Sequence, residues 1–158
     1  TRAMQLVAAA KMKKAQDQAM AGRDYSSQLN AVLSDISANF NDEASHPLLQ
    51  AREGKRELVL VISTDKGLCG PLNTNLAKKL RAETSDTADY VTVGRKLRVM
   101  LEKLGKKILA DFTVKDPVPF PDARAIAVFL TKQCTEGNYY KVSIVFTRFG
   151  AHGRTARN

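Results

Sequence analysis

The residues with the clearest potential for chemistry lie in the run 63–73, STDKGLCGPLN, which follows an apolar run. A glycine-containing turn between a strand and a helix is where α/β proteins commonly bind phosphate groups. A dinucleotide site requires GxGxxG, and a P-loop requires GxxxxGK[ST]. Here Gly67 and Gly70 are three residues apart, and Pro71 follows them without a Lys-Ser/Thr pair. The spacing favours a structural turn at Gly67 and Gly70 over a phosphate-binding loop.

Cysteine and histidine provide little else that could act as a nucleophile, a base or a metal ligand. Cys69 lies in the Gly-containing turn, but the two histidines, His46 and His152, are far from it in sequence. Cys69 and Cys134 have no CxxC spacing, and the HExxH and GxSxG motifs are absent from the sequence. We therefore expect no catalytic site, no protein-built metal site and no cofactor.

Length and charge narrow the class of protein further. The chain has 158 residues, 44% of them hydrophobic, with 25 Lys and Arg against 16 Asp and Glu. This length suits one ordinary domain with a real core. The net charge of +9 is spread along the chain, and aromatic residues make up only 6%. Because an RNA-binding surface combines clustered cations with aromatic side chains, the composition disfavours nucleic-acid binding.

The element that precedes the turn is a long helix, predicted from Arg2 to about Phe40. This stretch has no Pro and one Gly, and apolar residues recur at alternating spacings of three and four. At 1.5 Å per residue the helix would be about 58 Å long. The larger members of the apolar stripe lie in its second half: Leu29, Leu33, Ile36 and Phe40. We expect a coiled-coil partner helix outside this chain, although an amphipathic helix packed on its own domain is an alternative.

The rest of the chain alternates strand-like and helix-like segments after a linker. This pattern predicts an open, mostly parallel α/β sheet. A Pro-rich loop is expected at 114–121, and a turn at 150–153 should lead into an antiparallel edge strand. We divide the chain into a helix at 1–41, a linker at 42–56 and an α/β domain at 57–158. The predicted strands are 57–64, 88–93, 107–112 and 140–149, and the predicted helices are 71–83, 95–104 and 122–135.

Three blocks of sequence carry a resemblance to a known family. They are AMQLVAAAKM at 3–12, HPLL at 46–49 and ISTDKGLCGPLNTNL at 62–76. In order and separation they resemble the gamma subunit of F-type ATP synthase, the central rotor shaft. The family usually has Gly where this chain has Pro71, and often Arg where it has Lys66. These departures affect fine contacts only.

The resemblance implies a fold and a role. In that family an N-terminal and a C-terminal helix form an antiparallel coiled coil inside a hexamer of alpha and beta subunits. A Rossmann-like domain at the foot meets the epsilon subunit and the c-subunit ring. The gamma subunit does no chemistry itself but transmits rotation between the ion-driven ring and the catalytic sites. By this resemblance the chain is the first half of such a subunit, with its C-terminal helix missing and its α/β domain incomplete.

The resemblance also implies roles for particular residues. Met4, Lys11 and Lys14 would lie on the part of the helix near the catalytic subunits, and Lys66 would be a charged contact with the stator. Localisation would be peripheral, on the cytoplasmic face of a bacterial inner membrane or the equivalent organelle face. The main alternative function is a nucleotide-binding α/β enzyme with a helical oligomerisation arm, which saturable binding of ATP or NAD would reveal.

Overall fold

The chain forms two compact units, one containing a long helix and the other a parallel sheet with its helices. The computed structural model describes residues 1–38, 47–48, 53–137, 139–149 and 155–156. Phe40, His46 and the predicted turn at 150–153 lie outside these residues, as does most of the predicted linker. Among the described residues, no helix is both long and apolar enough to cross a bilayer.

Helix α1, Arg2–Ala38, is the main element of the first unit. Its length agrees with the uninterrupted three-and-four spacing and with the absence of proline. None of its residues is buried where the structure describes burial. The side chains of the apolar stripe are substantially exposed: 46% for Leu29, 41% for Leu33 and 39% for Ile36. The described members of the expected stripe are therefore exposed in this chain.

The second unit is built on a four-stranded sheet with strand order β3-β2-β1-β4. Its strands are β1 (Arg56–Ile62), β2 (Asp89–Val93), β3 (Ile108–Phe112) and β4 (Tyr139–Val145). All three strand pairings are parallel. The order reverses direction at β1, so the junction between β1 and β4 is a topological switch point, where α/β folds usually bind ligands. The prediction of an open parallel α/β sheet is confirmed.

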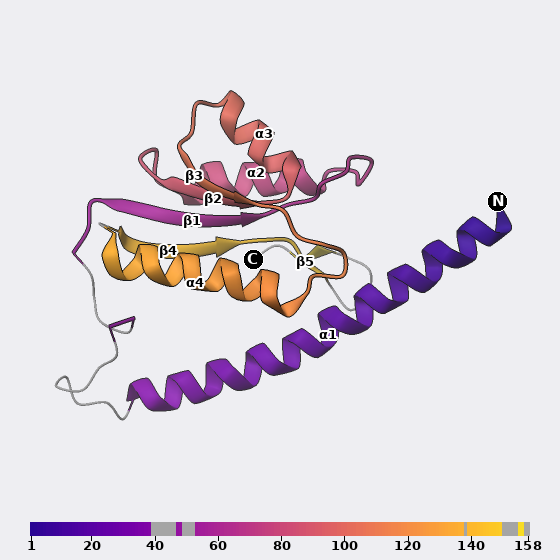
Figure 1. Ribbon diagram of the computed structural model, residues 1–158, viewed down its shortest axis with the longest axis horizontal. Helices are drawn as coiled ribbons and strands as arrows, with labels where there is room; N and C mark the ends of the chain where they lie inside the picture. The colour runs from indigo at the N-terminus through magenta and orange to yellow at the C-terminus, as the bar shows by residue number, and fades with distance from the viewer. Residues whose placement is uncertain (39–46, 49–52, 138, 150–154, 157–158) are drawn as a thin grey trace. The chain divides into compact units, whose positions relative to one another are not determined.

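Helices cover both faces of this sheet (Figure 1). Helices α2 (Leu72–Glu83) and α3 (Arg95–Lys103) lie on one face, and α4 (Phe120–Glu136) lies on the other. Residues alternate along β1, so Val59 and Val61 pack towards α2 and α3, while Leu58 and Leu60 pack towards α4. Burial on both faces explains why β1 is apolar at every position from 58 to 62.

Most boundaries in the α/β unit agree with the predicted ones to within one residue, and three differences are larger. β1 ends at Ile62 instead of Thr64, because Ser63 and Thr64 turn away to bind the start of α3. Helix α4 begins at Phe120, two residues early, with Pro121 in its first turn, where proline needs no hydrogen-bond partner. The predicted strand 140–149 is divided into β4 and the short β5 (Arg148–Phe149), which pairs with β6 (Thr155–Ala156) in a separate two-stranded sheet. The final strand is therefore not an edge of the main sheet.

Candidate functional site

The loop after β1 lies at the carboxyl end of the sheet, where the topology favours a ligand site. Its first residues bind the amino end of α3. The backbone N–H of Arg95 donates to Asp65 Oδ1 at 3.0 Å, that of Lys96 to the Thr64 carbonyl at 3.0 Å, and that of Leu97 to Ser63 Oγ at 3.1 Å. These are the first three amides of α3, the groups that would otherwise cradle a phosphate. The loop itself occupies the anion-binding end of this helix.

The second half of the loop is held by Asn73. Its Nδ2 donates to Thr64 Oγ1 at 2.7 Å and to Cys69 Sγ at 3.4 Å, while its Oδ1 accepts from the Thr64 backbone N–H at 3.4 Å. The Thr64 hydroxyl in turn donates to the Lys66 carbonyl at 2.8 Å. Asn73 therefore ties the start of α2 to the end of β1, and the Cys69 thiol takes part in a structural contact.

Glycines have different roles in this region. Gly94, which precedes α3, has φ of +99°, and a Cβ there would lie 2.1 Å from the Ser63 carbonyl oxygen. No side chain fits at this position. Gly70 has φ of +60° with open space around it, whereas a Cβ on Gly67 would meet only the end of the Lys96 side chain, at 3.4 Å from its Nζ. Backbone conformation thus demands glycine at 94, favours it at 70 and does not require it at 67.

The tip of the loop presents an apolar side chain among cations. Leu68 has φ of +59°, unusual for a residue with a Cβ, and its side chain is fully exposed. Lys66 in the same loop and Arg95 and Lys96 at the start of α3 are also exposed, together with the carboxylate of Asp65. Such a loop can contact another surface through one leucine and several positive charges. Within the described residues, no group of three or more His, Cys, Asp or Glu side chains is arranged to hold a metal ion.

The residues predicted to be functional fall in two places. Lys66, Gly67 and Gly70 share the loop after β1. Met4, Lys11 and Lys14 lie on the first half of α1, all exposed. Their roles as contacts or as a structural turn stay predictions, because they concern partners outside this chain or substitutions still to be made.

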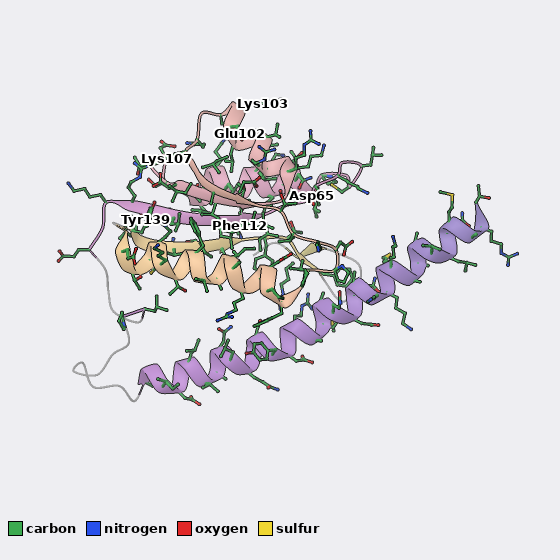
Figure 2. The ribbon with its side chains drawn as sticks, viewed as in Figure 1. Asp65, Glu102, Lys103, Lys107, Phe112 and Tyr139 are labelled. Atoms are coloured by element: carbon green, nitrogen blue, oxygen red, sulfur yellow. The ribbon has the colours of Figure 1, made fainter. Side chains whose placement is uncertain are left out.

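Sequence reasoning missed a polar cluster at the amino end of the sheet. Arg56 at the start of β1 donates to both carboxylate oxygens of Asp89 at the start of β2, with 3.1 Å from its Nε to Oδ2. The Tyr139 hydroxyl, from the start of β4, donates to Asp89 Oδ2 at 2.8 Å. Figure 2 shows Tyr139 and Asp65 towards opposite ends of the sheet. The cluster is therefore separate from the carboxyl-end loop.

A second buried carboxylate near the start of β1 has a separate set of partners. Glu57 is only 3% exposed and accepts from the Ser143 hydroxyl at 3.2 Å and the Ser85 backbone N–H at 3.3 Å. Lys141 Nζ lies 3.5 Å from the same carboxylate. The only signal in the sequence is an acidic residue at the head of each of two apolar strands, Glu57 and Asp89. That signal does not reveal the partners, which come from distant segments.

Burial and hydrogen bonding set the protonation of the first cluster. Burial of Asp89 favours its neutral acid, but the hydrogen bonds from Arg56 and Tyr139 and the Arg56 charge outweigh this, so the pKa of Asp89 is lowered. Burial, together with the hydrogen bond to Asp89 and its negative charge, raises the pKa of Tyr139 to about 12. At neutral pH the cluster is an ionised Arg56–Asp89 pair with a neutral tyrosine. Its donors and acceptors are used within the fold, which indicates a structural role.

Comparison with protein families gives one match over nearly the whole chain. A family model described as "ATP synthase" matches residues 1–156. Among curated proteins, the ATP synthase gamma chain of Akkermansia muciniphila is 40% identical over 149 residues, covering 94% of this chain and 51% of that protein. The ATP synthase gamma chain of Opitutus terrae is 42% identical over 149 residues, with 94% and 50% covered. The chain thus spans about half the length of the curated relatives it matches.

A solved structure supports the fold independently. The chain is similar to a rotor chain in the structure of the Euglena gracilis mitochondrial ATP synthase, with a TM-score of 0.52 and 15% identity. The match covers 89% of this chain and 58% of that one. At this identity the likeness concerns the fold: a long helix followed by a parallel sheet with helices.

Proposed function

Because the chain belongs to the ATP synthase family, we propose that it is part of the central rotor shaft of an F-type ATP synthase. It transmits rotation between an ion-driven membrane ring and the catalytic subunits, and it does no chemistry of its own. The observation that carries this proposal is about 40% identity to ATP synthase gamma chains over 94% of the sequence. The complex is membrane-associated, and this chain is peripheral, on the cytoplasmic face of a bacterial membrane or the equivalent organelle face.

The structure supports this role through α1. A helix of 37 residues with an exposed apolar stripe suits a shaft that pairs with another helix. We assign that pairing to a C-terminal helix, in the part of the relatives' length that this sequence does not span. The alpha and beta subunits would surround the resulting coiled coil, and the epsilon subunit and the c-ring would contact the α/β domain.

The loop after β1 supports a non-catalytic role. Its backbone amides and side chains bind one another and the amino end of α3, so a nucleotide phosphate would have to displace Ser63, Thr64 and Asp65. This arrangement disfavours the alternative of a nucleotide-binding enzyme. We place Lys66 and the exposed Leu68 at a contact with the stator. Lys11, Lys14 and Met4 would face the catalytic subunits along α1.

The first test is assembly. Tagged full-length protein, isolated from its own cells, should co-purify with the catalytic, epsilon and ring subunits of an ATP synthase. Isolation of the intact protein with none of these subunits would refute the proposal.

The second test concerns the lysines of α1. Lys11 and Lys14 lie about 60° apart around the helix and share a face. If they meet acidic stator segments during rotation, Lys11→Glu with Lys14→Glu should lower ATP-driven proton pumping relative to ATP hydrolysis, and more so at low salt. A matched control is Arg124→Glu with Lys132→Glu on α4, which makes the same change in net charge at exposed positions. Equal pumping-to-hydrolysis ratios in wild type and the α1 variant, at both ionic strengths, would leave these lysines as solvated side chains.

A further inference from the structure

A pocket of about 610 Å³ lies between α2 and α3 on one face of the sheet. Its two walls differ in chemistry. The α2 wall contributes the polar and basic residues Thr74, Lys78 and Arg81, together with Ala77 and Leu80. The α3 wall is apolar and consists of Leu97, Met100, Leu101 and Leu104. The pocket volume is within the range typical of small-molecule sites, about 300 to 1,000 Å³.

The floor of the pocket is apolar, and its one hydroxyl pair is already satisfied. The Thr84 hydroxyl donates to the Leu80 carbonyl at 2.6 Å. In its 3.0 Å contact with Tyr90, Thr84 is therefore the acceptor and the Tyr90 hydroxyl is the donor. Tyr90 is only 2% exposed, and Leu80 beside it is 3% exposed. The floor thus suits hydrocarbon and supplies no donor for a charged group.

Positive charge at the rim remains available for a ligand. Lys106 is the third cation of the lining and lies 3.9 Å from Asp86, the only carboxylate there. Within the described part of the chain, no carboxylate pairs with Lys78 or Arg81. By contrast Lys79, the next residue on α2, is outside the lining and pairs with Glu83 at 3.4 Å. The basic wall therefore has two cations without a counter-ion, beside an apolar cavity.

From this asymmetry we propose that the pocket binds a small anionic amphiphile, such as a medium-chain carboxylic acid. Its hydrocarbon body lies against Met100 and the exposed Leu104, above the buried Leu97 and Leu101, and its carboxylate pairs with Lys78 and Arg81. Burial of the body supplies most of the affinity, while the two cations select a negative over a neutral head group. This inference goes beyond the proposed function and does not depend on it.

The chain contains an internal reporter for a test. It has four methionines, of which Met100 lines the pocket and Met4, Met12 and Met20 lie on α1. We would titrate the 158-residue chain, labelled with ¹³C at the methionine methyl groups, with monomeric octanoate. The Met100 methyl signal should shift saturably, and the three α1 signals should stay unchanged. If all four signals shift together without saturation, the binding is non-specific and the proposal fails.

Two matched comparisons test the head-group contact. Lys78→Gln with Arg81→Gln should weaken octanoate binding by about tenfold, as expected for the loss of two partly exposed ion pairs. Lys79→Gln with Lys103→Gln removes the same net charge from positions on α2 and α3 outside the pocket lining, and should leave the affinity within twofold. The uncharged analogue 1-octanol should bind wild type about tenfold more weakly than octanoate. Equal affinity in the two double variants, or for the two ligands, would overturn the proposal.

Discussion

Helix α1 and the helices of the α/β unit use similar spacings of apolar residues but bury them differently. In α2, Leu76 and Leu80 are 5% and 3% exposed, and Leu97 in α3 is fully buried. In α1, Leu29 is 46% exposed and Met4 is 76% exposed. Full burial of such a side chain is worth about 1.5 to 3 kcal/mol. The α/β unit therefore has its own core, whereas the described apolar side chains of α1 are left exposed.

The comparison shows that an apolar stripe predicts a helix without predicting what covers it. The length of a helix says more about what can cover its apolar side. Helices α2 and α3 have 12 and 9 residues, whereas α1 has 37. A compact sheet of five- to seven-residue strands offers no face long enough for such a helix. Paired substitutions, one in each region, can break or sharpen this contrast.

Truncation of a leucine that a helix buries against the sheet should have the largest effect. Leu97→Ala removes a fully buried side chain and should lower the free energy of unfolding of the α/β unit by about 3 kcal/mol. Leu29→Ala on α1 should change the stability of this chain by less than about 1 kcal/mol. Urea unfolding, together with amide exchange of the β1 backbone, measures the free energy of unfolding in both variants. Similar losses for the two variants would mean that α1 is packed as tightly as α3.

Replacement of glycine by alanine should change the stability in opposite directions in the two regions. Gly94→Ala forces a Cβ to 2.1 Å from the Ser63 carbonyl at a φ of +99°, so it should destabilise the α/β unit by about 2 kcal/mol or more. Gly22→Ala in α1 meets nothing within 4 Å and should stabilise the helix by about 1 kcal/mol through helix propensity. Amide exchange near each site reports both changes. A stabilising Gly94→Ala would contradict the close approach of β1 and α3.

Removal of a charge should lower the free energy of unfolding appreciably only where the charge is buried. Asp89→Asn leaves Arg56 without its carboxylate and should cost about 2 kcal/mol, whereas Asp17→Asn on exposed α1 should cost less than about 0.5 kcal/mol. The folded-state pKa of Asp89 is lowered, so its contribution is present above the unfolded pKa near 3.8 and is lost as pH falls through the folded pKa. Acid unfolding of wild type and Asp89→Asn should converge below that pH, and parallel curves would argue against this linkage.

The smallest effect should come from Tyr139. Its folded-state pKa is about 12, against 10.0 for the ordinary group, so its contribution is complete below pH 10 and is lost as pH rises towards 12. Tyr139→Phe should cost about 1 kcal/mol and remove the tyrosine absorbance step near pH 12. Tyr25→Phe on α1, where the side chain is 70% exposed, should leave that step in place. Persistence of the step in Tyr139→Phe would assign it to another residue.

The sequence was sufficient for the elements and the fold class, because these depend on local periodicity. The three-and-four spacing of α1 and the apolar runs of β1 and β2 are visible without coordinates, and the blocks at 3–12 and 62–76 were sufficient for the family resemblance. Element ends were harder to predict. β1 stops at Ile62 because Ser63 binds Gly94 and Leu97, more than 30 positions later. A partner so far along the chain cannot be inferred from the residues next to Ile62.

Only the tertiary structure decided which residues meet across long distances. Arg56, Asp89 and Tyr139 come from the starts of three strands, and strand order alone brings them to one cluster at the amino end of the sheet. The pocket between α2 and α3 likewise depends on two helices crossing the same face, which places the basic side of one beside the apolar side of the other. The sequence alone determined which side chains each helix has on each face, because helical geometry is local. Their partners depend on packing between segments, which the order of residues along the chain does not display.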